Sequence, residues 1–108
     1  MKNRFITAAL LFIILFSSTI VYALTTVRGR VNRGVYPAAY VQVTLWSQRI
    51  GRSAPTYTGQ DGMYYLYNIP PGLYTVELWC YKTPRTYTKI RIPPNLRNYD
   101  IPPLQINW

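Results

Sequence analysis

The stretch DGMYYLYNIPPGLYTVEL, from Asp61 to Leu78, predicts two strands joined by a corner that no β-ladder can cross. Pro70 and Pro71 have no backbone donor for a ladder, and Gly72 lets the backbone turn sharply. On both sides of the corner, residue types alternate as in strands with one buried face. The residues expected to face inward are Tyr64 and Leu66 before the corner, and Tyr74, Val76, Leu78 and Cys80 after it.

The same alternation continues in both directions along the chain, interrupted by turn residues. It predicts seven short strands, at residues 25–31, 40–47, 56–58, 63–68, 73–81, 87–92 and 99–106. Residues 49–55 are expected to form a loop, and the proline pair at 102–103 predicts a bent or edge strand there. Short strands with one apolar face each predict an all-β fold, a seven-stranded antiparallel or mixed β-sandwich.

The first residues have the pattern of an export signal. Lys2 and Arg4 precede an almost wholly apolar run at 5–16, and Val21 and Ala23 form a small-residue cleavage pattern. This predicts a signal peptide at 1–23 and an exported domain at 24–108. No charge occurs between Phe5 and Val27, so an uncleaved membrane anchor is the alternative. Both place the domain in the periplasm, the cell envelope or the extracellular space.

The expected domain is strongly basic. It has ten basic and three acidic residues, which leave a net charge of +7. Such a surface favours an acidic glycan or a phosphate-bearing envelope component, while export disfavours nucleic acid as a partner. A membrane partner is expected only if the N-terminal segment stays uncleaved, and a general solubility role for the charge is the alternative.

Cysteine usage excludes an internal disulfide. The chain has one cysteine, Cys80, which alternation places inward as a buried thiol. The alternative is an exposed thiol that forms a disulfide-linked dimer.

The segments VRGRVNRGVYPAAYVQVTL and TYTGQDGMYYLYNIPPGLYTVEL together resemble the carboxypeptidase regulatory-like domain. The resemblance covers residues 27–78, and the corner Pro-Pro-Gly-x-Tyr is its most specific part. It implies a transthyretin-like (prealbumin-like) β-sandwich, a fold grouped with some carbohydrate-binding modules. It also implies a non-catalytic role, as an accessory module beside an enzyme or as a small cell-surface or envelope protein. The chain departs from the pattern by one extra residue before Pro37 and by Thr58-Gly59, where Thr-Asp is common.

The sequence contains few side chains of the kinds that carry out catalysis. The chain has no histidine, which excludes histidine-based triads and histidine zinc ligands. Its three carboxylates, Asp61, Glu77 and Asp100, are far apart in sequence, and Glu77 is expected to face outward. The sequence therefore predicts a protein that is not an enzyme and holds no cofactor or metal.

Outward aromatic rings with basic neighbours form the predicted binding site. Its members are Trp46, Tyr65, Tyr67, Trp79, Tyr81, Lys89 and Arg91. If the strands on either side of the corner lie together, these residues form one patch suited to sugar faces or protein partners. The alternatives are rings that only stabilise the sheet, or a patch buried in a homodimer or a larger envelope assembly.

The sequence thus predicts an exported, non-catalytic β-sandwich module that acts in protein interaction or envelope assembly. The alternative function is a carbohydrate-binding module that uses the outward aromatic face.

Overall fold

A computed structural model describes residues 24–108, apart from the side chain of Thr86. The predicted signal peptide and the alternative anchor lie outside the described residues. Every regular element of the described range is a strand, which confirms the all-β class. The strands are β1 (Thr25–Arg33), β2 (Tyr36–Pro37), β3 (Gln42–Ser47), β4 (Gly51–Arg52), β5 (Thr56–Tyr57), β6 (Met63–Ile69), β7 (Gly72–Cys80), β8 (Thr83–Ile92), β9 (Asn98–Asp100) and β10 (Leu104–Ile106). The described residues contain no helix that is long and apolar enough to span a membrane.

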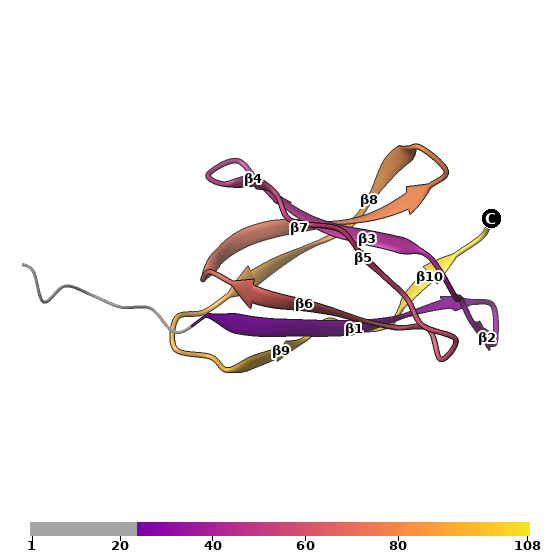
Figure 1. The fold of residues 1–108 in the computed structure, drawn as a ribbon, viewed down its shortest axis with the longest axis horizontal. Coiled ribbons are helices and arrows are strands. Elements are labelled where there is room, and N and C mark those ends of the chain that lie inside the picture. Colours follow the sequence, from indigo (N-terminus) through magenta and orange to yellow (C-terminus); the bar gives the residue numbers. More distant parts are fainter. Residues whose placement is uncertain (1–23) are drawn as a thin grey trace, which may run out of the picture.

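The strands form two five-stranded sheets that pack face to face (Figure 1). In the first sheet, β1 is central: it pairs antiparallel with β2 and β6 and parallel with β9 and β10. In the second sheet, the order is β4-β3-β7-β8, with β5 also paired to β3, and every pair is antiparallel. The predicted mixed β-sandwich is therefore confirmed, with the strand count raised by several two- and three-residue strands.

The core lies between the sheets and consists mainly of residues that alternation placed inward. Tyr64 and Tyr74 are both buried, as predicted. The other large buried residues of the core are Val27, Val31, Val41, Val43, Leu45, Leu66, Ile69, Val76, Leu78, Ile90, Ile92, Ile101 and Ile106. Because these side chains come from both layers, burial of their apolar surface holds the two sheets together.

The Pro-Pro-Gly corner transfers the chain from one layer to the other. It links β6, which ends at Ile69 in the first sheet, to β7, which begins at Gly72 in the second. Gly72 has φ 151°, a conformation that residues with a Cβ rarely adopt. The hydroxyl of Tyr74 donates a hydrogen bond of 2.7 Å to the carbonyl oxygen of Pro70, so a core residue fastens the corner that precedes it.

Gly29 provides a second backbone constraint. A Cβ at this position would overlap the phenol ring of Tyr64, so the ring packs directly on the β1 backbone. The Tyr64 hydroxyl has no hydrogen-bond partner among the described residues, and burial raises the pKa of this phenol. Packing against the glycine therefore decides the position of this ring, because no hydrogen bond fixes it.

Three local predictions are corrected. The predicted loop at 49–55 contains β4, because residues Ser47 and Gly51 pair to form a short hairpin. The strand predicted to begin at 87 begins at Thr83, because β8 continues the hairpin with β7 through a register shift. Cys80 is half-buried rather than enclosed, because it lies at the end of this hairpin.

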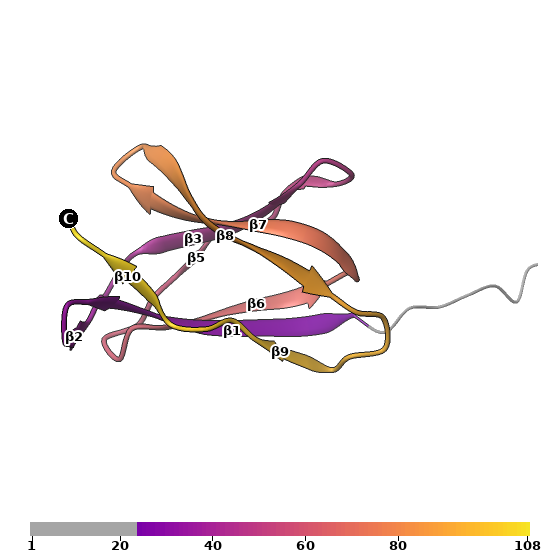
Figure 2. The same cartoon turned by 180° about the vertical axis from the view of Figure 1, so that it is seen from behind.

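The C-terminal prediction is confirmed. The segment around Pro102 and Pro103 bends, so that β9 and β10 are separate short strands. Both pair with β1 on the same side of the sandwich (Figure 2).

Candidate functional site

The predicted aromatic patch is divided between the two outer faces of the sandwich. Tyr65 and Tyr67 stack on the outer side of the first sheet, with ring centroids 6.4 Å apart and planes at 15°. Trp46 and Trp79 belong to β3 and β7 of the second sheet. The rings would form one patch only if β6 and β7 lay side by side in one sheet. The corner instead carries β7 into the opposite layer, so the rings are separated.

Tyr81 belongs to neither of these sheet faces. It lies in the turn between β7 and β8, is 95% exposed and has φ 58°. It therefore belongs to a hairpin tip and not to a sheet face.

Trp79 is part of a closed polar cluster on the outer face of the second sheet. We call it the Arg52 cluster and define it as Thr44, Arg52, Glu77 and Trp79. Arg52 binds the carboxylate of Glu77 through two hydrogen bonds, of 2.7 Å to Oε1 and 3.1 Å to Oε2. Thr44 donates to Oε1 of Glu77 at 2.9 Å and accepts from Nε1 of Trp79 at 2.9 Å. The Arg52 guanidinium also lies 5.0 Å from the centre of the Trp79 ring, a cation–π contact.

The electrostatics of the cluster favour the charged form of both partners. The hydrogen bonds from Arg52 hold the pKa of Glu77 below its usual range, and the bond from Thr44 acts in the same direction. The same pair raises the pKa of Arg52. Glu77 is only 8% exposed although it faces outward, because Arg52 and its neighbours cover it. Its charge is therefore satisfied internally.

Sequence reasoning missed this cluster for a specific reason. The sequence pattern correctly places Glu77 on the outer face, but it predicts a loop at Arg52. The hairpin of β3 and β4 brings Arg52 beside Trp46, and the pairing of β3 with β7 brings Thr44 beside Glu77. A useful signal was available in the sequence: Glu77 is the one acidic residue in the segment 62–99, which is otherwise basic.

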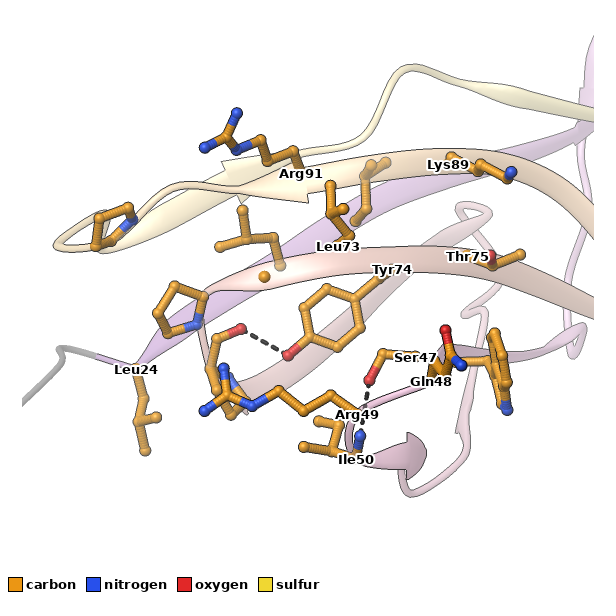
Figure 3. Close-up of a pocket in the computed structure, with 17 residues that line it drawn as sticks. Leu24, Ser47, Gln48, Arg49, Ile50, Leu73, Tyr74, Thr75, Lys89 and Arg91 are labelled. Carbon is orange, nitrogen blue, oxygen red and sulfur yellow. Dashed lines mark hydrogen bonds between the residues drawn. The ribbon is translucent and has the colours of Figure 1, made fainter.

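The remaining predicted residues converge on an open groove at one end of the sandwich (Figure 3). The groove has a volume of about 1070 Å³ and is bordered by the β3–β4 turn, the Pro-Pro-Gly corner and the end of β8. Trp46, Lys89 and Arg91 all line it. The structure thus brings together three of the predicted site residues, from two strands that do not pair with each other.

Sequence reasoning did not include the other lining residues that define the character of the groove. Arg49 and Ile50 come from the β3–β4 turn, Leu73 from the start of β7, and Leu24 from the first described position. The turn is held by Ile50 N, which donates to Oγ of Ser47 at 3.1 Å. Figure 3 shows the Arg49 side chain extending along the groove on one side of Tyr74, with Leu73 and Arg91 on the other side.

The groove is cationic and apolar at the same time. Arg49, Lys89 and Arg91 are exposed along it, and none of the residues that line it is a carboxylate. The ion pairs among the described residues are Arg28 with Asp100 and Arg52 with Glu77, so the three groove cations belong to neither. Leu24, Ile50 and Leu73 are 51%, 52% and 72% exposed, which leaves apolar surface beside these charges.

The charge of Arg49 affects the hydroxyl of Tyr74, which lines the groove. Burial raises the pKa of the Tyr74 hydroxyl, and the positive charge of Arg49 partly opposes this rise. Figure 3 shows the Arg49 side chain beside Tyr74, whose hydroxyl fastens the corner.

The chemistry available in this groove is the binding of anions. Guanidinium groups donate paired hydrogen bonds to phosphate and carboxylate, and exposed aliphatic side chains bind apolar surface. No group of three metal-ligating side chains occurs among residues 24–108.

Comparison with known proteins supports the fold. No family model and no curated protein matches the chain. A DUF3823 family protein from Parabacteroides merdae superimposes with a TM-score of 0.56 at 13% identity, covering 77% of this chain and 45% of that one. BcpA, the major pilin subunit of Bacillus cereus, gives 0.58 at 12% identity, covering 79% and 30%. GBS52, a minor pilin of Streptococcus agalactiae, gives 0.54 at 14% identity, covering 80% and 46%.

These similarities concern the fold alone, because the sequence identities are low. The chain spans less than half the length of each of these three proteins. They place it among two-sheet β-sandwiches and do not show the carboxypeptidase regulatory-like family.

Proposed function

We propose that this protein is an exported, non-catalytic module that takes part in envelope assembly by binding a negatively charged partner in the groove. We further propose that it is a carboxypeptidase regulatory-like domain. The Pro-Pro-Gly-x-Tyr corner supports this family, because Tyr74 fastens that corner by its hydrogen bond to Pro70.

The observation that carries the proposed function is the unpaired charge of the groove. Three cations, Arg49, Lys89 and Arg91, line one concave surface together with exposed apolar side chains and without a carboxylate. A partner that supplies negative charge and apolar contact completes such a surface.

The comparisons are consistent with a role in assembly. Two of the similar structures are pilin subunits, which are components of assemblies. The alternative of carbohydrate binding relied on one aromatic face, and the division of that face between the two sheets weakens it. Within the groove, Trp46, which is 42% exposed, is the ring on which a sugar would stack.

Photo-crosslinking in the native envelope tests this proposal. A photoreactive amino acid replaces Ile50 or Leu73 in the groove and, as a matched control, Val35, which is 88% exposed in the turn between β1 and β2. We expect adducts from the groove positions and none from the control. The absence of any adduct at both groove positions, in a chain that is exported and folded, would refute the proposed function.

A further inference from the structure

The groove lies next to the first described residue of the chain, and this position bears on the identity of its partner. Leu24 lines the groove and immediately precedes β1. In the sequence, the uncharged and mainly apolar run that starts at Phe5 leads directly to this residue. In a chain that keeps this run, the most lipid-like segment therefore joins the domain at its cationic and apolar groove.

We propose that this end of the sandwich docks on the surface of an anionic lipid bilayer, an inference that rests on the proposed function and names its partner. Arg49, Lys89 and Arg91 bind lipid phosphates, and the side chains of Leu24, Ile50 and Leu73 enter the boundary between headgroups and acyl chains. Cations beside exposed aliphatic residues are the combination that holds proteins at membrane interfaces.

Charge complementarity favours a bilayer over a single soluble anion. The cations lie on separate elements, Arg49 on the β3–β4 turn and Lys89 and Arg91 on β8. A sheet of phosphates reaches separated cations at once, whereas one phosphate group pairs with one or two. The exposed leucine and isoleucine side chains around them do not contribute to binding inorganic phosphate. Contact with acyl chains would bury their apolar surface, which is favourable.

The opposite end of the sandwich, shown at β2 in Figure 1, differs from the groove in carrying a carboxylate among its charges. It also exposes apolar side chains, Val35 and Tyr36. Its carboxylate, Asp61, lies in the turn before β6, and Nε of Arg33, one of its cations, donates to the carbonyl oxygen of Trp108 at 2.6 Å. The groove end is therefore the one suited to an anionic surface.

Vesicle flotation of the full chain, exported and purified in the form that the cell produces, tests the inference. Binding is measured to phosphatidylcholine vesicles and to vesicles with equal parts of phosphatidylglycerol and phosphatidylcholine. The ratio of the two affinities is the readout, because a retained apolar segment contributes to both. The test variant is Arg49→Glu with Arg91→Glu, and the control is Arg30→Glu with Lys82→Glu, which changes the net charge equally outside the groove.

We expect the groove variant to lower the preference for anionic vesicles by about tenfold or more, and the control to keep it within about twofold. Ile50→Ser with Leu73→Ser is expected to weaken binding to the anionic vesicles at high salt, where the apolar contact remains. Equal losses in the groove and control variants would mean that net charge alone attracts the protein, and would overturn the inference. A wild-type chain without any preference for anionic vesicles would overturn it too.

The outcome also separates this inference from the proposed function. If the vesicle preference is absent but Ile50 and Leu73 still crosslink to an envelope protein or a glycan, the lipid inference fails and the proposed function stands. If inorganic phosphate abolishes vesicle binding at matched ionic strength, the groove is a site for a single phosphate and the docking inference fails.

Discussion

Arg52 and Arg49 lie three residues apart on the β3–β4 hairpin, yet they have opposite roles. Arg52 is held by two hydrogen bonds to Glu77 and lies over the ring of Trp79. Arg49 points into a groove that no carboxylate lines. The Arg52 cluster is closed and complete, whereas the groove leaves its charges available.

The position of one carboxylate, Glu77, accounts for the difference between the two arginines. Arg52 is within reach of this carboxylate, and Arg49 lines a groove that contains none. Glu77 is the carboxylate of β7, and the register of β3 with β7 puts it opposite Thr44, within reach of Arg52. A cation with a partner contributes to stability, while a cation without one contributes to binding. The two regions should therefore respond differently to mutation.

The largest expected effect is that of Glu77→Ala, which should lower the free energy of unfolding by about 2 kcal/mol. The substitution leaves the buried Thr44 hydroxyl without its acceptor and Arg52 without its counter-ion. Urea denaturation measures the change. A loss below about 0.5 kcal/mol would show that the cluster does not stabilise the fold.

The pH dependence of stability sharpens the same point. Because Arg52 lowers the folded-state pKa of Glu77, the charged form stabilises the fold at pH values above the unfolded pKa, about 4.3. This contribution is lost as the pH falls through the lowered folded pKa. We expect the difference in unfolding free energy between wild type and Glu77→Gln to be constant near neutral pH and to shrink under acid. The ion pair of Asp100 is common to both chains and cancels, so a difference that grows under acid would contradict the assignment.

A smaller loss is expected for Trp79→Phe, about 1 kcal/mol. The change removes the hydrogen bond from the indole to Thr44 and keeps an aromatic ring near Arg52. The matched control is Trp46→Phe, an exposed ring in the groove, which should change stability by less than about 0.5 kcal/mol. Equal effects at the two positions, measured by thermal unfolding, would remove the distinction between cluster and groove.

The smallest effect on stability is expected in the groove itself. Arg49→Ala combined with Arg91→Ala should change the free energy of unfolding by no more than about 0.5 kcal/mol, because both side chains are exposed and unpaired with any described carboxylate. The same variant should lose crosslinking from Ile50 in the envelope. A loss of stability above about 1 kcal/mol would mean that these arginines serve the fold.

The sequence predicted the core because a period of two fixes which side of a strand is buried. This pattern, together with the family resemblance, places Tyr64 and Tyr74 inward, and the pattern places Lys89 and Arg91 outward. The period does not specify which sheet a strand joins. A corner such as Pro70-Pro71-Gly72 fits both a hairpin within one sheet and a passage between two, so Tyr65 and Trp79 appeared to share a face.

The groove and the Arg52 cluster depend on long-range pairing that local patterns do not contain. Arg52 and Glu77 are 25 positions apart and meet only after β3 has paired with β7. The groove collects residues from the first described position, the β3–β4 turn, the corner and the end of β8. These segments are farther apart in sequence than the length of any strand. They come together because the sandwich topology brings them to one end.

Hydrogen exchange of the full chain with and without anionic vesicles tests most directly whether the groove end is the binding surface. We expect slower exchange of the backbone amides in the β3–β4 turn, including Ile50, when vesicles are present. We expect no change in the turn around Gly34 and Val35 at the far end of the sandwich. Protection of that far turn, with unchanged exchange at Ile50, would contradict docking through the groove.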